Sequence, residues 1–272
     1  MSQKSQDPQA GIDCMTAEGT ERNIRVGCVL LASGASVRFG EENKLLADLQ
    51  GRPLVAHVLS TLCALLQADG PKDKSSNLAS SFSVPVGDTD TVTCCPVVVC
   101  EDAEVNRLAR DAGFDTLCAP HPLQSDTVRD GLSYLLSRHA GSAPLGGCMF
   151  VAADQPFLTA ESIRRLLAQF AAEPSRPCRL AYREAVSDTS PASTSGAATL
   201  PSRGGPVSPE YTHITPGNPV IFPAAMFDAL LSLTGDQGGG ILLRKKKPAF
   251  VFVSDKRELL DIDTIADLRS FP

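Results

Sequence analysis

The sequence is poor in aromatic residues and has no long apolar run. Its 272 residues include no Trp, and aromatic residues make up only 5%, so platforms that stack single-stranded nucleic acid are not expected. No apolar run approaches the ~20 residues that a membrane-spanning helix needs. The first residues carry no apolar stretch of the kind found in secretory signals. These absences predict a soluble, cytoplasmic protein that binds neither nucleic acid nor membranes.

Cysteine is present, but not in the arrangement of a metal site or a disulfide framework. The nine cysteines are an odd number, and no two of them form a CxxC pair, which is the common spacing of zinc sites. Several lie within apolar segments. We therefore expect reduced thiols, most of them buried in the core.

The apolar segments alternate between strand length and helical spacing. Residues 26–32 form a continuous apolar run typical of a central parallel strand, and apolar residues from Leu54 onward recur with helical period. We expect further strands at residues 97–100, 114–118, 148–153, 218–222 and 249–253, and helices at 103–112, 127–137, 163–170, 223–233 and 264–269. This pattern predicts an α/β fold: one doubly wound, Rossmann-like domain with a mainly parallel central sheet and a binding crevice at the carboxyl ends of the strands.

Three segments do not share this pattern. Residues 1–23 are polar and aperiodic, which predicts a disordered N-terminal tail. The stretches at about 69–95 and 183–210 are rich in Ser, Thr, Gly, Pro and Asp, and we interpret both as low-complexity insertions that loop from the surface. The domain itself is expected to span residues 24–272.

The loop after the first strand is suited to binding phosphate. It reads SGASVRFGEENKLL, and the small residues Ser33, Gly34 and Ser36 let backbone amides approach a phosphate chain. Arg38 and Lys44 can neutralise that chain, which matters because the formal net charge of the protein is −6. The loop is not a P-loop, because its lysine does not follow the last glycine directly. The alternative is a tight turn whose basic residues are solvated.

Carboxylates follow two of the apolar segments. Asp154 ends the buried strand in VAADQPF, where a hard oxygen ligand would face the crevice and suit Mg²⁺; capping of the next helix is the alternative. Asp261 and Asp263 alternate with Ile262 in LDIDT, so both carboxylates point the same way and could complete a magnesium site. For Asp263 the alternative is capping of the helix that follows.

Six ordered motifs resemble one family of enzymes. The string LLASGASVRFGEENKLL, followed by GRPLVAHVL, is similar to the signature loop of the nucleotidyltransferases that mature the molybdenum cofactor. More narrowly, it resembles the molybdenum cofactor cytidylyltransferase group. The resemblance resumes at LQSDTVRDGL, VAADQPFLT, PGNPVIF, LTGDQGGGILLRKKK and LDIDTIADL. It does not extend to the tail or the two insertions.

The resemblance implies a reaction in which the terminal phosphate of molybdopterin attacks the α-phosphorus of CTP. Pyrophosphate leaves, and molybdopterin cytosine dinucleotide forms for use by molybdenum hydroxylases. The implied cofactor is Mg²⁺ or Mn²⁺, and the implied partners are CTP, the molybdenum cofactor, and an apo molybdenum hydroxylase or its maturation chaperone.

Three alternatives to this reaction stay open. Two keep the enzyme class: a guanylyltransferase of the same cofactor, and a cytidylyltransferase of a sugar or polyol phosphate. Ser33 stands where the guanylyl group usually has glycine and CTP users usually have alanine, so it does not choose the base. The third is a non-catalytic protein that binds and delivers the cofactor.

The resemblance also assigns roles to residues. Arg38, Lys44 and Asp154 would be catalytic, with Lys44 on the α-phosphate and Arg38 on the β- and γ-phosphates. The metal would be held by Asp154 and Asp263, with Asp261 as the other candidate. The nucleotide side would comprise Leu31, Ala32, Ser33, Gly34, Ser36, Arg38, Lys44, Ser125, Asp126 and Thr127, and the molybdopterin side Gln155, Pro156, Asn218, Pro219, Asp236 and Gly238. Helix capping stays the alternative for residues 125–127. The basic run 244–247 is either a contact for the molybdopterin phosphate or a solvated face.

Overall fold

The computed structural model describes residues 22–33, 39, 43–66, 81–86, 90–119, 123–185 and 211–271. Its strands are β1 (Asn23–Leu31), β2 (Asp48–Leu49), β3 (Arg52–Pro53), β4 (Phe82–Val86), β5 (Asp90–Val99), β6 (Asp115–Leu117), β7 (Gly147–Ala152), β8 (Cys178–Ala185), β9 (Tyr211–Pro223) and β10 (Ala249–Phe252). Its α-helices are α1 (Leu54–Leu66), α2 (Ala103–Asp111), α3 (Gln124–Arg138), α4 (Ala160–Ala172), α5 (Phe227–Leu231) and α6 (Ile265–Arg269). Its 3₁₀-helices are η1 (Lys44–Leu46), η3 (Ala224–Met226), η4 (Gly239–Arg244) and η5 (Lys256–Leu259).

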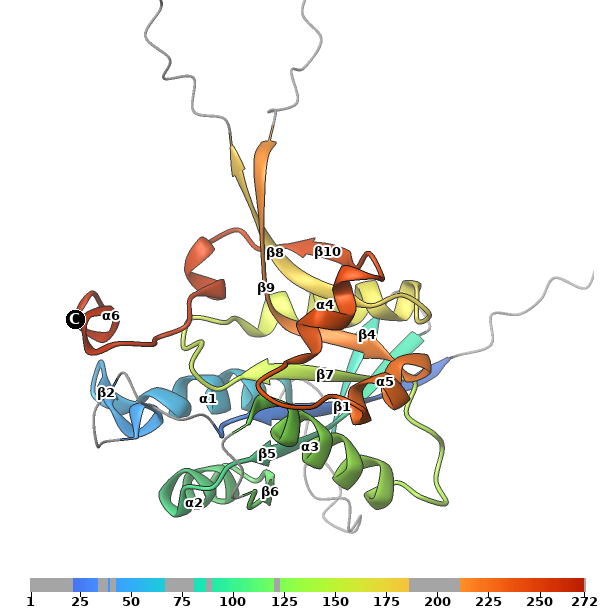
Figure 1. Ribbon diagram of the computed structural model, residues 1–272, viewed down its shortest axis with the longest axis horizontal. Helices are drawn as coiled ribbons and strands as arrows, with labels where there is room; N and C mark the ends of the chain where they lie inside the picture. The colour runs from blue at the N-terminus through green and yellow to red at the C-terminus, as the bar shows by residue number, and fades with distance from the viewer. Residues whose placement is uncertain are drawn as a thin grey trace, which may run out of the picture.

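One mixed sheet forms the centre of the molecule (Figure 1). Within the described ranges, eight strands join it in the order β10-β8-β9-β7-β1-β5-β4, with β6 paired to β5. The pairs β1-β5, β1-β7, β5-β6 and β8-β10 are parallel. β9 runs antiparallel to both β7 and β8, and β4 runs antiparallel to β5. β1 therefore has a parallel neighbour on each side, as its continuous apolar sequence predicts.

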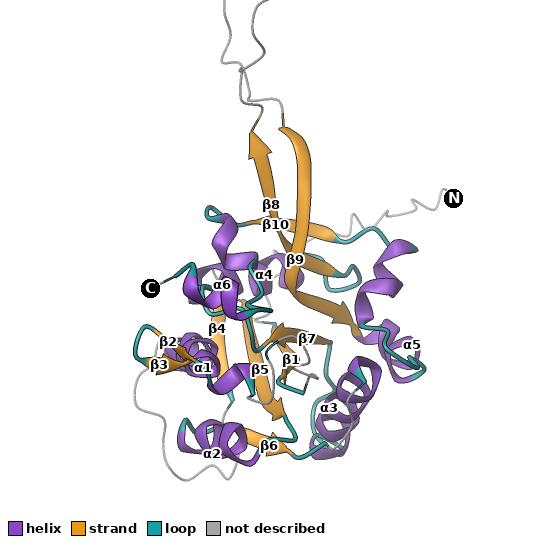
Figure 2. Cartoon of the chain, turned by 60° about the vertical axis from the view of Figure 1, so that its left-hand side comes forward, coloured by secondary structure: helices purple, strands orange, loops and turns teal. Residues whose placement is uncertain are grey.

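Helices cover both faces of this sheet. Buried residues of α1, α2 and α4 join Val26, Cys28 and Leu30 of β1 in one apolar cluster. Residues of α3, α5 and η4 form a second cluster around Val29. Successive side chains of a strand point to opposite faces, which explains how one strand serves both clusters. Figure 2 shows α1 and α2 on one side of the sheet and α3 and α5 on the other, so the expected doubly wound α/β fold is confirmed.

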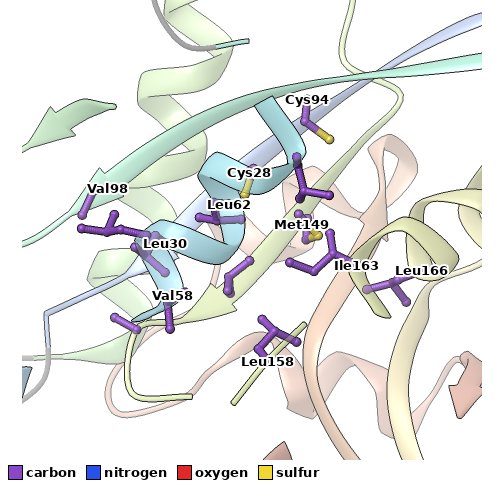
Figure 3. Packing of buried hydrophobic residues seen from close by; sticks show 14 of the residues in the cluster. Cys28, Leu30, Val58, Leu62, Cys94, Val98, Met149, Leu158, Ile163 and Leu166 are labelled. Carbon is purple, nitrogen blue, oxygen red and sulfur yellow. The ribbon is translucent and has the colours of Figure 1, made fainter. Parts of the chain in front are cut away.

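The first cluster holds the sheet to α1 and α4 (Figure 3). Cys28 and Leu30 of β1 and Met149 of β7 lie among Leu62 of α1 and Ile163 of α4, and all five side chains are at most 1% exposed. Burial of one such large apolar side chain contributes ~1.5–3 kcal/mol. This packing fixes the carboxyl ends of β1 and β7, from which the candidate site is built.

On the opposite face, α3 lies unusually close to β1. A Cβ atom at Gly131 would lie 2.5 Å from Cγ1 of Val29, well inside van der Waals contact. Only a residue without a side chain fits at this crossing. The close approach fixes the middle of α3 relative to β1.

The prediction of a surface insertion at 69–95 is wrong for its second half. β4 and the first part of β5 belong to the sheet, and Phe82, Val84, Val92 and Cys94 are buried. These residues alternate with Ser and Thr, so a strand pattern of period two is hidden in a composition typical of loops. At the second predicted insertion, residues 183–185 continue β8. The remainder of that insertion, and nearly all of the predicted N-terminal tail, lie outside the described residues.

The described cysteines are all free thiols, as expected, and most of them are buried. Cys14 lies outside the described residues. In the part of the chain that the structure covers, no helix is both long and apolar enough to cross a membrane.

Candidate active site

A cleft of about 1150 Å³ opens at the carboxyl ends of β1 and β7. Its walls come from the ends of β1 and β7, η1, the first turns of α3, β9, and the segment 236–244. It is lined by Leu31, Ala32, Ser33, Lys44, Leu45, Leu123, Gln124, Thr127, Val128, Phe150, Ala152, Asp154, Asn218, Val220, Phe222, Asp236, Gln237, Gly238, Gly239, Gly240, Ile241, Arg244 and Asp263. The cleft lies where ligands bind in doubly wound sheets, beyond the carboxyl ends of the strands.

Lys44 is held in place by the turn that it begins. The side chain of Asn43 accepts a hydrogen bond from the Leu45 N–H at 3.0 Å and caps η1. The pKa of Asp102, the N-cap of α2, is lowered chiefly because its carboxylate accepts a hydrogen bond from the Val105 N–H, and a hydrogen bond with the Asn43 side chain lowers it further. Leu45 is 5% exposed and packs in the core. The backbone around Lys44 is therefore anchored on both sides, and its long side chain reaches into the cleft.

Asp154 lies two residues after the end of β7 and is tied to the C-terminal segment of the chain. Its carbonyl oxygen accepts a hydrogen bond from the Ile262 N–H at 3.0 Å. Ile262 is fully buried, whereas Asp261 and Asp263 on either side of it are exposed. The expected alternation along LDIDT is confirmed, and it is this backbone contact that brings Asp263 beside Asp154.

The three charged groups meet at the Lys44 ammonium. Nζ of Lys44 lies 2.6 Å from Oδ2 of Asp154 and 3.0 Å from Oδ1 of Asp263. The Lys44 and Asp154 side chains are 15% and 19% exposed, and that of Asp263 is 49% exposed. Burial alone would lower the pKa of Lys44, but the two carboxylates outweigh it and the pKa is raised. Lys44 therefore carries its charge throughout the neutral range.

Asp261 faces the same cluster from its edge. The residue as a whole is exposed, but its carboxyl group is partly withdrawn from water. This burial, together with the charge of Asp154, raises the pKa of Asp261 to about 6. A hydrogen bond from Gln155 favours the ionised form and limits the rise. Asp261 thus senses the negative charge of the site without contacting Lys44 directly.

The alternative roles of these aspartates as helix caps are excluded by the geometry. Thr159 caps α4 by accepting a hydrogen bond from the Ser162 N–H. Thr264 caps α6 and forms a capping box with Asp267. The carboxylates of Asp154 and Asp263 are directed to Lys44 instead.

The donor set fits a divalent cation with hard ligands. Two carboxylates converge on a single positive group, and carboxylate oxygens are the ligands that Mg²⁺ and Mn²⁺ prefer. In the described part of the chain, no group of three or more His, Cys, Asp or Glu side chains is placed to hold a metal ion. A metal held by Asp154 and Asp263 would therefore take its other ligands from substrate oxygens and water.

On the predicted nucleotide side, the structure brings together only some of the residues. Leu31, Ala32, Ser33 and Thr127 line the cleft. Oγ of Ser33 donates a hydrogen bond to the Val99 carbonyl at 3.2 Å, which ties the end of β1 to the end of β5. Gly34, Ser36 and Arg38 lie outside the described residues.

The interpretation of residues 125–127 as caps is wrong. α3 begins earlier than predicted, after Leu123, which makes no side-chain cap. Ser125 is fully buried in its first turn. Asp126 pairs with Arg129 at 2.7 Å. Neither Ser125 nor Asp126 lines the cleft. Ser, Asp and Thr favour the cap position, which is why the sequence suggested a cap here. The helix in fact starts after Leu123, an extended residue whose side chain cannot cap.

On the predicted acceptor side, Asn218, Asp236 and Gly238 line the cleft. The peptide bond between Asn218 and Pro219 is cis, and Pro219 is buried behind the wall. Gln155, 1% exposed, and Pro156 are also buried and do not line the cleft. Of the six residues assigned to this side, the structure places three on the cleft surface and three beneath it.

Sequence reasoning missed the apolar floor of the cleft. Phe150, Val220 and Phe222 line it, and the rings of Phe150 and Phe222 meet edge to face at 5.9 Å. The motif PGNPVIF placed Val220 and Phe222 on one side of a strand, because they are two residues apart. Nothing in the sequence says that this side faces a cleft instead of a closed core.

The fold and the site define a class: an α/β domain that holds a lysine and paired carboxylates at the carboxyl ends of its parallel strands. Residues 28–249 match the model of the MobA-like NTP transferase domain, which covers well over half of the chain. This protein therefore belongs to the family of MobA-like NTP transferase domains, and it is a nucleotidyltransferase.

Several known proteins are similar to this chain in sequence or in fold. The 2-C-methyl-D-erythritol 4-phosphate cytidylyltransferase of Dehalococcoides mccartyi is 26% identical over 104 residues, which is 35% of this chain and 42% of that protein. The chain thus spans less than half of that relative. Rv0371c of Mycobacterium tuberculosis H37Rv, solved as a complex with manganese, shares the fold at a TM-score of 0.53 and 16% identity, covering 91% of this chain and 97% of the other. A CMP:2-keto-3-deoxy-manno-octonic acid synthetase complexed with CTP shares the fold at a TM-score of 0.54 and 13% identity. The match covers 92% of this chain and 96% of the other.

Proposed function

We propose that this enzyme transfers CMP from CTP to the terminal phosphate of molybdopterin. A phosphate oxygen of the acceptor forms a bond to the α-phosphorus of CTP. The bond between that phosphorus and the oxygen bridging to the β-phosphate breaks, and pyrophosphate leaves with the electron pair. The product is molybdopterin cytosine dinucleotide. Because a phosphate monoester is already an anion at neutral pH, the reaction needs no strong general base.

The observation that carries the proposal is the position of the Lys44, Asp154 and Asp263 cluster within the cleft. The sheet order places β7 between β1 and β9. The end of β1 bounds one side of the cleft, and β9 bounds the other with the segment 236–244, which packs on the first turn of α3. A reaction that joins two molecules needs its charged groups between them, and Asp154 follows β7 in that middle position.

The size of the cleft supports two substrates. Pockets for one drug-sized ligand typically measure ~300–1,000 Å³, and this cleft measures about 1150 Å³. A nucleotide on the β1 side leaves space for a second molecule over the apolar floor of β9. A carrier that delivers a finished cofactor has no need of a charged cluster at the centre of such a cleft.

The charged groups supply alignment and neutralisation. Lys44 would bind the α-phosphate, and Arg38 in the signature loop would bind the β- and γ-phosphates. Asp154 and Asp263 would hold Mg²⁺ or Mn²⁺, which supplies neutralisation of the phosphate oxygens when it is bound. The manganese in the Rv0371c structure supports this assignment. Fixed positive charge beside a reacting phosphate stabilises the transition state more than the ground state.

Two relatives and the sequence motifs bear on the choice of substrates. The cytidylyltransferase of Dehalococcoides mccartyi and the synthetase complexed with CTP support CTP as the nucleotide. Molybdopterin as the acceptor is supported by the motifs from SGASVRFGEENKLL to LDIDT. The second candidate is transfer of CMP to a sugar or polyol phosphate, which the name of the Dehalococcoides mccartyi relative favours.

Purified protein incubated with Mg²⁺, one NTP and one acceptor would test the proposal. Pyrophosphate release is measured, and the product is identified by mass. We expect product from CTP with molybdopterin. Product from GTP and not CTP would overturn the base assignment. Product with 2-C-methyl-D-erythritol 4-phosphate and not molybdopterin would establish the second candidate. The protein would act as a delivery module if molybdopterin bound tightly and no NTP gave product.

A further inference from the structure

We propose that Arg244 binds the attacking phosphate of the acceptor and thereby selects acceptors that carry a phosphate monoester. This inference rests on the proposed function, because it assigns a residue to the acceptor of that reaction. It does not depend on which molecule carries the phosphate. Four observations support it: the place of Arg244 on the cleft wall, its lack of a partner among the described residues, its position beside β9, and the packing of its segment.

Arg244 is the member of the basic run RKKK that faces the cleft. All four residues are exposed, but Arg244, which ends η4, lines the cleft and the three lysines do not. A run of four basic residues is usually a solvated surface, and for the three lysines this holds. Ile241, three residues before Arg244, lines the cleft as well, as expected for a 3₁₀-helix with three residues per turn.

The guanidinium of Arg244 is available for a ligand. Among the residues that the structure describes, it takes part in no ion pair and no side-chain hydrogen bond. Among the described residues that line the cleft, the other cation is Lys44, which is already shared by two carboxylates. A planar guanidinium with several fixed donors is well suited to bind phosphate oxygens in pairs.

The position of Arg244 assigns it to the acceptor and not to the nucleotide. η4 packs in the cluster of α3 and α5 next to β9, through Leu243 and Phe222. β9 is separated from β1, where the nucleotide is proposed to lie, by β7. Because the nucleotide is proposed to lie on the β1 side, the acceptor and its attacking phosphate are placed on the β9 side, which carries Arg244.

The segment that carries Arg244 is packed against the start of α3. A Cβ atom at Gly238 would lie 2.5 Å from Oε1 of Gln124, so the segment sits directly on this side chain. A Cβ atom at Gly239 would likewise lie 2.8 Å from the ring of Phe222. These two close approaches hold the segment against α3 and β9, and they place Arg244 at a defined position above the apolar floor.

Steady-state kinetics on the full chain would test the assignment. KM is measured for the acceptor and for CTP, with molybdopterin and 2-C-methyl-D-erythritol 4-phosphate as acceptors. The variants are Arg244→Gln, Arg244→Lys and the matched control Lys246→Gln. Loss of a charged hydrogen bond is expected to raise the acceptor KM of Arg244→Gln by about 10- to 100-fold. The KM for CTP should change less than twofold, Arg244→Lys should recover part of the loss, and Lys246→Gln should match the wild type.

The outcomes separate this inference from the proposed function. Turnover of one acceptor by the wild type, with an acceptor KM that is equal in Arg244→Gln and Lys246→Gln, overturns the role of Arg244 and leaves the proposed function standing. An increase confined to the KM for CTP also overturns it, since Arg244 would then bind the nucleotide. Failure of the wild type to use either acceptor overturns the proposed function and this inference together.

Discussion

The ammonium of Lys44 lies between two carboxylates, 2.6 Å from Asp154 and 3.0 Å from Asp263, although these residues are 110 and 219 positions away in the sequence. One positive charge therefore faces two negative ones. The cluster keeps a net negative charge, which a bound metal would compensate. A phosphate chain entering the cleft would compete with the carboxylates for the same lysine, which places Lys44 at the centre of any transfer.

Replacing Lys44 by methionine tests this role. Lys44→Met keeps the length of the side chain but removes its charge. We expect transfer to fall by about 100-fold or more, as for the loss of one donor that stabilises a transition state. Pyrophosphate release under saturating substrates measures the effect, and Lys246→Met serves as the control because Lys246 is exposed and outside the cleft. Activity within twofold of the wild type would contradict the assignment.

A second prediction separates the aspartates. Asp263 contacts Lys44 beside Asp154, whereas Asp261 contacts Gln155 instead. We therefore expect Asp154→Asn and Asp263→Asn to weaken Mn²⁺ binding in the presence of CTP by about 10-fold or more, as the loss of one charged ligand implies. Asp261→Asn should change it much less. Calorimetric titration with Mn²⁺ measures the affinities, and a larger loss for Asp261→Asn than for Asp263→Asn would reverse the choice of ligand.

The crossing of α3 and β1 gives a prediction for stability. Gly131→Ala introduces a methyl group 2.5 Å from Val29, and both segments are held by the core. We expect the free energy of unfolding to fall by about 1–3 kcal/mol, the usual cost of overpacking. Gly240→Ala is the matched control, since no atom lies within 4 Å of the added group. Urea unfolding followed by circular dichroism compares them. Equal stability of the two variants would show that α3 can shift without cost.

The buried thiols predict sensitivity to alkaline pH. Burial raises the pKa of the Cys28 thiol to about 12 from its ordinary value of 9.0, and it raises the pKa of Cys94 and Cys148 well above that value. A group whose pKa is raised in the folded state stabilises fully below its unfolded pKa and loses that contribution as the pH rises toward the folded pKa. We expect the free energy of unfolding to fall by about 1.4 kcal/mol per buried thiol for each pH unit above 9.

Unfolding in urea at pH 7, 9 and 10, with a reducing agent present, measures this dependence. Cys28→Ala removes one of the buried thiols, so its unfolding free energy should fall less steeply above pH 9 than that of the wild type. Cys118→Ala is the control, because Cys118 is exposed. Identical slopes for Cys28→Ala and Cys118→Ala would mean that the buried thiol is not linked to stability.

Much of the fold could be predicted because its signals are local. The continuous apolar run of β1 and the helical spacing of α1 each lie within a short window of sequence. The N-cap of α4 at Thr159 is an equally local feature. β4 was missed because its alternating apolar residues stand among Ser and Pro, and the early start of α3 was missed because Leu123 carries no cap. In both cases the surroundings in the folded chain outweighed the composition of the segment.

The candidate site, like the fold, could be predicted only in part. Lys44, Asp154 and Asp263 could be named from motifs, since each follows a recognisable apolar segment. That they meet at one ammonium could not be read from the motifs, because it depends on the pairing of Ile262 with Asp154 across the chain. The apolar floor at Phe150 and Phe222 and the orientation of Arg244 were equally out of reach, since a run of basic residues does not reveal which one turns inward.

The sequence by itself determined the alternation of strands and helices, the residues suited to phosphate and metal, and the family that these motifs resemble. Such properties follow from side-chain chemistry and local periodicity. Only the tertiary structure decided which carboxylates share the lysine and which residues of α3 reach the cleft. It also decided that β9 and the segment 236–244 form the side of the cleft proposed for the acceptor. These depend on contacts between segments far apart in the chain, and packing of the two layers against the sheet is what sets them.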